Sequence, residues 1–207
     1  MKKLWKFMLV LVLSVAMIGC SSKDDESATV KKQVNSFFTA LQKGDTDKVQ
    51  KLCSASVSKQ LGLTALDQQF EQFTDTETYG ETFIKEANKF KEDVFSSLFE
   101  NIKIGKITVK DDKATVVVSG KAKDYNGINF DSSEVETLVQ NYINEHMSEF
   151  AGMTSQKEMT VKLFDDVSKD MFDVLKNQLK DVKSTSFKSK LTLSKIDDKW
   201  KITEMDN

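Results

Sequence analysis

The chain has 207 residues, with 30 basic and 32 acidic side chains and one histidine, which gives a net charge of −2 at pH 7. This length suits one domain with a sizeable core. Every basic residue is a lysine, so bidentate recognition of phosphate or carboxylate by arginine is excluded. The lysines alternate along the chain with aspartate and glutamate, and we therefore expect no basic face and no nucleic-acid partner.

The first 28 residues, MKKLWKFMLVLVLSVAMIGCSSKDDESA, begin with lysines and continue with an uncharged run from Phe7 to Gly19. That run is shorter than the roughly 20 apolar residues that a membrane-spanning helix needs. A positive start, an apolar run of this length and a small residue at its end are typical of a signal peptide. The tetrapeptide Met17-Ile18-Gly19-Cys20 resembles the lipobox of bacterial lipoproteins, in which the cysteine is lipidated and becomes the mature N-terminus.

We therefore expect residues 1–19 to be a lipoprotein signal peptide, and Cys20 to attach the protein by lipid to the extracytoplasmic face of the cell membrane. The alternative is an ordinary secretory signal in which Cys20 has no role. Residues 20–28 are polar and acidic, and we expect a flexible tether with a reach of about 30 Å. Because Cys20 is committed to lipid, Cys53 is the one remaining thiol and the mature chain forms no internal disulfide.

The segment after the tether has the apolar spacing of helices. Apolar residues recur at i, i+4, i+7 and i+8 over residues 30–41, where Thr29 is placed to cap the start and Gly44 the end. Asp45 is placed to cap a second short helix. A further stripe of helical period covers residues 83–98. The first half of the mature chain is therefore predicted to be mainly helical.

The apolar period changes to two from Ile102 onward. Ile102 and Ile104 alternate, Gly105 interrupts, and Ile107 and Val109 resume on the other parity, which predicts a bulge in a strand. The tripeptide Asp-Asp-Lys then separates this strand from a run rich in β-branched residues, so we expect an antiparallel hairpin. A second hairpin with the same tripeptide is predicted at the C-terminus.

Between the two hairpins the helical period returns. Apolar residues have helical spacing over residues 135–150 and again over residues 164–182. We therefore expect a helical insertion at about residues 131–183, within a single α+β domain that covers residues 29–207.

One family resemblance rests on the order of these elements. Phe38, Leu41, Gly44 and Asp45 match a pattern of the first helix and its turn in the nuclear transport factor 2 like (cystatin-like cone) superfamily. More narrowly, the chain resembles lipoproteins of Gram-positive bacteria that carry such a domain. The resemblance implies N-terminal helices packed on a curved antiparallel sheet of about four strands, with a cone-shaped pocket between them.

The side chains that we expect to line such a pocket are Phe38, Tyr142, His146 and Trp200. His146 is the only histidine, and with Glu145 or Glu149 beside it a general base is one interpretation. A histidine on the flank of a helix more often has a structural or solvent-facing role, and we expect no catalytic residue.

Several further candidates for chemistry favour a structural interpretation. Cys53 is expected to be a buried structural cysteine. We expect no metal site, since one histidine and one free thiol cannot bind zinc alone, and Gly127 is misplaced for a calcium loop beginning at Asp124. Asp165 and Asp166 are adjacent, so they should point to different sides of a helix. The lysine-rich stretch at residues 176–190 is expected to be a solvated face.

The function that the sequence favours is that of a lipid-anchored, extracytoplasmic and non-catalytic protein, which binds a small ligand or a protein partner at the cell surface without a cofactor. One alternative is an enzyme with isomerase- or dehydratase-like acid/base chemistry in the cone pocket, since the superfamily hosts both enzymes and binders. Another is a structural accessory subunit of an envelope complex.

Overall fold

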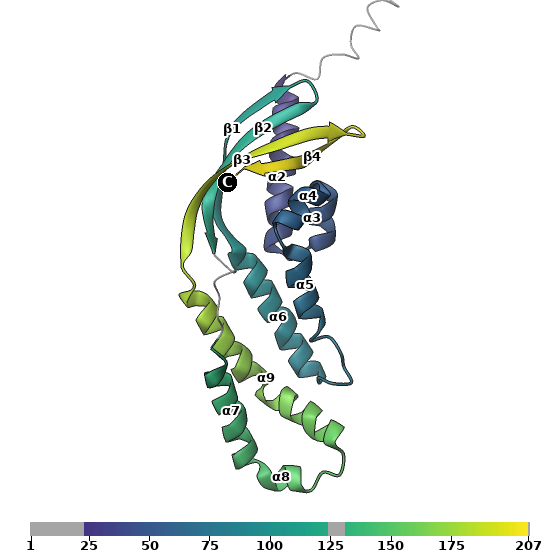
Figure 1. Cartoon of the computed structure of the whole chain (residues 1–207), viewed down its shortest axis with the longest axis vertical. Helices are drawn as coiled ribbons and strands as arrows, with labels where there is room; N and C mark the ends of the chain where they lie inside the picture. The colour runs from purple at the N-terminus through teal and green to yellow at the C-terminus, as the bar shows by residue number, and fades with distance from the viewer. Residues whose placement is uncertain (1–22, 124–130, 207) are drawn as a thin grey trace, which may run out of the picture.

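The computed structural model describes residues 23–123 and 131–206. Helices come first, a β-hairpin follows, a helical insertion interrupts the sheet, and a second hairpin closes the chain (Figure 1). The elements are α2 (Lys23–Gln42), α3 (Thr46–Leu52), α4 (Ala55–Gln60), α5 (Leu63–Glu71), α6 (Glu81–Leu98), β1 (Phe99–Lys110), β2 (Lys113–Lys123), α7 (Ser132–Glu145), α8 (Met147–Ala151), α9 (Gln156–Asp181), β3 (Ser184–Ile196) and β4 (Lys199–Asp206). The predicted α+β class is confirmed.

The two hairpins form one antiparallel sheet of four strands in the order β1-β2-β3-β4. The central strands β2 and β3 pair along their whole length, up to Lys123 opposite Ser184. The insertion α7–α9 therefore leaves and rejoins the sheet at paired ends of neighbouring strands. The predicted bulge is present as a shift of register between Ile104 and Ile107.

Both predicted turns are tight. Lys110 pairs with Lys113 across the first turn, and Ile196 with Lys199 across the second. Asp197 and Asp198 both have positive φ, at 49° and 58°, as the two central residues of a type I′ turn require. Aspartate tolerates this left-handed conformation better than most residues, which explains its presence in these turns.

The first hydrophobic core lies between the inner face of the sheet and helices α2–α4. Alternate residues of three strands point into it, as the period of two predicts. Its buried side chains are Val30, Val34, Phe37, Phe38, Ala40, Leu41, Val49, Cys53, Val57, Phe95, Ala114, Val116, Val118, Leu191, Leu193, Trp200 and Ile202. Gly44 ends the first helix with φ of 64°, and a Cβ there would come within 3.0 Å of the Phe95 ring.

The predicted start of the first helix at Thr29 is wrong, because α2 begins at Lys23. Thr29 lies inside the helix, where its hydroxyl donates to the carbonyl oxygen of Asp25 at 2.9 Å. Glu26 forms an ion pair of 3.2 Å with Lys195 of β3. This tertiary contact supports a helix over a segment whose polar composition predicts a tether, and residues 20–22 lie outside the described part of the chain.

A second hydrophobic core joins α6 to α9. Its buried members are Phe83, Ala87, Phe90, Val94, Phe172 and Leu179. Because α6 also contributes Phe95 to the first core, one helix spans both. The 26 residues of α9 extend over about 39 Å, so the insertion projects well beyond the sheet (Figure 1).

The N-terminus of α6 is capped by a residue from α9. Gly80 precedes the first turn and supplies no side-chain cap of its own. Instead, the amide of Phe83 donates to Oδ1 of Asp165 at 3.0 Å. A Cβ at Gly80 would stand 2.0 Å from the same oxygen, so this approach requires glycine.

The helix predicted over residues 135–150 is interrupted. α7 ends at Glu145 and α8 begins at Met147, with His146 between them at φ −109° and ψ 17°. Two helices, α4 and α5, were not predicted as separate elements. The molecule is elongated, with the start of α2 near one end of its long axis and α8 at the other (Figure 1).

Candidate functional site

Two of the four predicted pocket residues lie in the first core. Phe38 and Trp200 are each 4% exposed. Phe38 contacts Phe37 and Phe99 edge to face, with ring centroids 5.4 and 5.6 Å apart. The interior between the sheet and α2 is therefore filled by side chains at these positions, and the prediction that Phe38 and Trp200 line an open pocket is not supported.

Tyr142 and His146 lie elsewhere, in the insertion. Their rings stack with centroids 4.1 Å apart and an angle of 17°, and Phe150 meets Tyr142 edge to face. Nδ1 of His146 lies 3.0 Å from the carbonyl oxygen of Tyr142. The structure therefore brings these two predicted residues together but separates them from Phe38 and Trp200.

A network of polar side chains surrounds Tyr142 and ties the insertion together. The Tyr142 hydroxyl donates to Oδ2 of Asp166, and Nζ of Lys162 donates to the same oxygen at 2.5 Å. Lys162 also lies 3.4 Å from Oε2 of Glu149. Side chains from α7, α8 and α9 thus meet at one point. Lys162 and Asp166 are four residues apart on α9. This spacing, which places opposite charges side by side on a helix, is the one signal of the network that the sequence contains.

The contacts in this network favour the usual protonation states of its members, which are an anionic Asp166, a cationic Lys162 and a neutral Tyr142. Burial raises the pKa of Asp166, but hydrogen bonds from Lys162 and Tyr142 outweigh it and hold that pKa below its usual value. Burial and the hydrogen bond to Asp166 raise the pKa of Tyr142. The hydrogen bond to Asp166 also raises the pKa of Lys162. None of these three groups moves toward neutrality, where a general acid or base works best.

An open hollow of about 590 Å³ lies between α7 and α9, beside this network. Four carboxylates and no lysine occur among its lining residues, which are Ser133, Glu134, Thr137, Leu138, Asn141, Tyr142, Glu145, Asp166, Val167 and Asp170. Leu138 and Val167 add apolar surface between the polar groups. The hollow is thus open and lined mainly by residues with hydrogen-bonding or anionic groups, so an occupant would be recognised through polar contacts more than through apolar burial.

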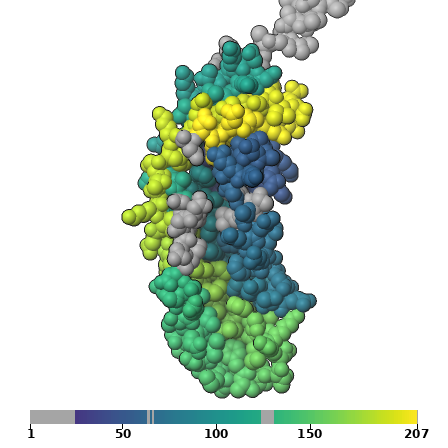
Figure 2. All heavy atoms as spheres, viewed as in Figure 1, coloured from purple at the N-terminus to yellow at the C-terminus, as the bar shows by residue number. Residues whose placement is uncertain are grey.

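The insertion also leaves apolar side chains of α7 partly exposed. None of the residues of α7 is fully buried, although Val135, Leu138, Val139 and Ile143 follow a helical stripe. Met147 of α8 is 59% exposed. Figure 2 shows this part of the chain, in green, forming one end of the molecule.

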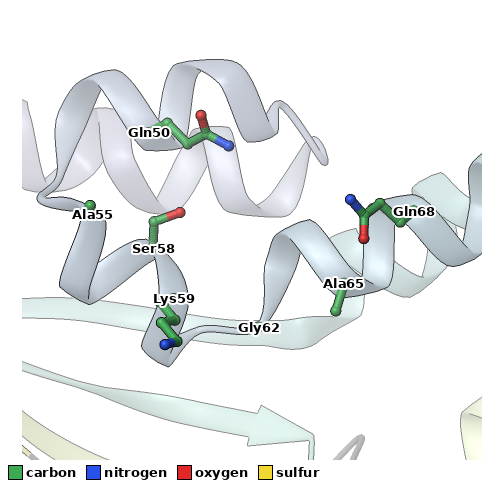
Figure 3. A pocket seen from close by; sticks show the side chains of 7 residues that line it. All are labelled: Gln50, Ala55, Ser58, Lys59, Gly62, Ala65 and Gln68. Atoms are coloured by element: carbon green, nitrogen blue, oxygen red, sulfur yellow. The ribbon is translucent and has the colours of Figure 1, made fainter.

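A second hollow of about 530 Å³ lies between α3, α4 and α5. Figure 3 shows Gln50, Ser58 and Gln68 around it, with Lys59 and Gly62 at its edge. Among these lining residues only Lys59 is charged, and no titratable pair converges there. This hollow offers fewer specific contacts than the hollow between α7 and α9.

Cys53 occupies the position that the sequence predicts. It is 3% exposed, and it forms an isolated bridge with Ile202 of β4. Burial raises the pKa of its thiol, so the nucleophilic thiolate is disfavoured. The predicted burial of this cysteine is therefore confirmed.

The adjacent carboxylates also behave as predicted. Asp165 caps α6, whereas Asp166 binds Tyr142 and Lys162, so the two point to different partners. Over residues 23–123 and 131–206, no group of three or more histidine, cysteine or acidic side chains is placed to hold a metal. Most of the loop considered for calcium, and the whole lipobox with Cys20, lie outside the described residues.

Within the described ranges, no helix is both long enough and apolar enough to cross a bilayer. Comparisons of the chain with protein-family models, with curated proteins and with solved structures found no match.

Proposed function

We propose that the mature protein is a lipid-anchored, extracytoplasmic binding protein without catalytic activity, which takes a small ligand or a protein partner in the hollow between α7 and α9. The observation that carries this proposal is the contrast between the two ends of the molecule. Phe38 and Trp200 fill the interior beside the sheet, whereas the insertion keeps an open hollow with converging polar groups and a partly exposed apolar stripe.

The architecture of the fold supports the resemblance to the cone superfamily. N-terminal helices pack on one face of a curved four-stranded antiparallel sheet, the arrangement that this resemblance implies (Figure 1). In this chain the insertion α7–α9 adds the hollow that the filled interior lacks. An acid/base enzyme is less well supported, because Tyr142, Glu149 and Asp166 near His146 are held in ion pairs and hydrogen bonds.

Metabolic labelling with an alkyne fatty acid tests the anchor. We expect label on the wild-type protein and on a Cys53→Ala variant, because the anchor is carried by Cys20 alone. A Cys20→Ala variant should take up none. The lipid anchor is refuted if Cys20→Ala is labelled as strongly as the wild type.

Site-specific photocrosslinking in intact cells tests the hollow. A photoreactive residue at Asn141, which lines the hollow, should give a discrete adduct, because an occupant lies against it. The same residue at Asn177, an exposed position of α9 outside the lining, is the matched control.

The adduct should disappear when Glu134 and Glu145 are both changed to lysine, since the hollow then loses its anionic lining. Identical adducts from Asn141 and Asn177, or an adduct that survives this charge reversal, would show that the hollow is not the binding site.

A further inference from the structure

The sheet sorts lysines onto its outer face. In β2 and β3 the core takes Ala114, Val116, Val118, Leu191 and Leu193, so the residues between them point outward. Lys188 and Lys190 flank the buried Ser189 in this way. We define the lysine face as the outward lysines Lys103, Lys110, Lys113, Lys121, Lys188, Lys190, Lys199 and Lys201.

Strand register places these lysines in neighbouring rows. Lys103 and Lys188 both lie opposite Ser119, one on each side of β2. Another row runs from Lys110 through Lys113 and Ser194 to Lys201. Serine and threonine occupy many positions between the lysines, so the ammonium groups stand above a surface of short side chains.

Within the strands few acidic groups offset this charge, since the outward acidic residues are Glu100, Glu204 and Asp206. The hairpin turns add Asp111, Asp112, Asp197 and Asp198, which offset the lysines beside the turns. The least compensated lysines are therefore those farther along the strands, Lys103 and Lys188 among them. Lys190 lies 3.6 Å from Asp206, but both side chains are more than half exposed, so the attraction between them is weak. The sequence-based expectation of no basic face is therefore wrong for the sheet. Lysines alternate with other residues along the chain, but successive side chains of a strand point to opposite faces of the sheet, so the lysines gather on one face.

The lysine face is open to solvent. Seven of its eight lysines are exposed, and Lys201 is half-buried. The helices that the structure describes beside the sheet, α2, α3, α4 and α6, pack against its inner side (Figure 1). The opposite end of the molecule has the opposite charge, since residues 131–183 hold six lysines and eleven acidic residues.

We propose that the lysine face docks on an anionic bilayer surface and orients the protein, with the acidic insertion directed away from the membrane. The bilayer is chosen over other polyanions on the strength of the proposed lipid anchor. The face and the anchored end of the chain are also close together. Glu26 binds Lys195, and the amide of Lys195 donates to the carbonyl oxygen of Asp112 at 2.9 Å, so α2 begins beside both hairpin turns.

A lipid chain and a basic patch together hold a protein more firmly than a single lipid chain does. Each lysine close to an anionic surface strengthens binding by roughly fivefold, and the effect is lost beyond the screening length. Because the sheet is curved with the lysine face on its outer side, a flat bilayer meets part of the face at one time (Figure 1).

Vesicle co-sedimentation tests this proposal with a soluble form that starts at Ser21 and keeps every described element. We expect binding to vesicles with about 30% phosphatidylglycerol in phosphatidylcholine, and none to phosphatidylcholine alone. Changing Lys103, Lys121, Lys188 and Lys190 to glutamine should weaken binding at least about tenfold, since four cationic contacts are removed. Raising the salt from about 0.05 M to about 0.5 M should have a similar effect.

The matched control changes four exposed lysines outside the sheet, Lys85, Lys157, Lys169 and Lys180, to glutamine. It alters the net charge equally and should bind almost as the wild type does. Equal weakening in both variants would overturn the proposal, because overall charge would then explain binding. Thermal unfolding of both variants, followed by circular dichroism, checks that each is folded.

Two further outcomes would also overturn it. One is binding of soluble polyphosphate or DNA through the lysine face when vesicles are not bound. The other is salt-sensitive self-association through the same face, between the basic sheet of one copy and the acidic insertion of another. Because the soluble form lacks Cys20, vesicle binding and lipidation can fail separately.

Discussion

Asp165 joins two helices through a single hydrogen bond. Its Oδ1 accepts from the amide of Phe83, one of the amides at the start of α6 that has no partner within the helix. A carboxylate at this end also interacts favourably with the helix dipole. Gly80 makes the approach possible, so the two residues act together although they are far apart in the sequence.

We expect Asp165→Ala to lower the free energy of unfolding by about 1 kcal/mol, the usual effect of losing an N-terminal cap. Asp165→Asn retains an acceptor oxygen and should recover most of the loss. Urea unfolding measures both. Asp166→Ala, which breaks an exposed network instead, should cost less, and a larger loss for Asp166→Ala would contradict this assignment.

Neither partner of this cap could be assigned from the sequence. The Asp165–Asp166 pair shows only that two neighbouring carboxylates diverge, and the residue that each one meets depends on how α9 crosses α6 and α7. The predicted pocket fails for the same reason. Phe38 and Trp200 have the large aromatic side chains of a pocket wall, but the same side chains fill a core when the facing strands bring Leu191 and Ile202 against them.

At the scale of elements, α9 is the helix that holds the insertion together. It packs on α6 through the second hydrophobic core, and it binds α7 and α8 through the network of Tyr142, Lys162 and Asp166. The contacts to α6 bury aromatic side chains, whereas the contacts to α7 are more exposed. We therefore expect α7 to open locally more often than α6, which hydrogen exchange measures.

The Asp166 network predicts a pH dependence. The pKa of Asp166 is lower in the folded state than its unfolded value of about 3.9, so its contribution to stability is present above that pH and is lost as the pH falls. At pH 7 the wild type should be more stable than Asp166→Asn, by less than about 1 kcal/mol at this exposed site.

The difference between wild type and Asp166→Asn should shrink as the pH falls below about 3.9, because the unfolded state then takes up a proton at Asp166 before the folded state does. Urea unfolding at pH 7 and at a series of pH values below about 4 measures it. A difference that stays constant with pH would show that the charge of Asp166 does not contribute.

The local elements were the most predictable part of the molecule. Helix and strand periods, the bulge near Gly105 and both Asp-Asp-Lys turns depend on neighbouring residues, and a single sequence records them. The early start of α2 was missed because it depends on an ion pair with Lys195, which is remote in the sequence. The interruption at His146 was missed because the apolar spacing continues through it.

At the scale of the whole molecule, two hydrophobic cores share one helix. α6 contributes Phe95 to the core beside the sheet and Phe83, Phe90 and Val94 to the core beside α9. Disruption of either core therefore removes support from the same helix. We expect the described residues to unfold as one cooperative unit although the molecule is elongated.

This cooperativity can be tested with Phe172→Ala in the second core. The substitution should lower the free energy of unfolding by about 3–5 kcal/mol, because removal of the Phe172 ring leaves a cavity beside Phe83 and Phe90. Trp200 lies in the first core, and Trp5, the other tryptophan, lies in the predicted signal peptide, so fluorescence of the mature chain reports on the first core alone.

The fluorescence and far-ultraviolet circular dichroism transitions of Phe172→Ala should move together to lower urea concentration. A fluorescence transition that stays at its wild-type midpoint would show instead that the two cores unfold independently.

The early start of α2 also limits how far the protein can move from its membrane. Three residue steps separate Cys20 from the first helical residue, Lys23, and they span about 11 Å at full extension. With the proposed anchor, this short linker lets the folded part rotate but keeps its anchored end close to the bilayer. The protein therefore meets its partners by lateral diffusion in the plane of the membrane. A partner therefore meets the acidic insertion at a distance from the bilayer that the folded part itself sets.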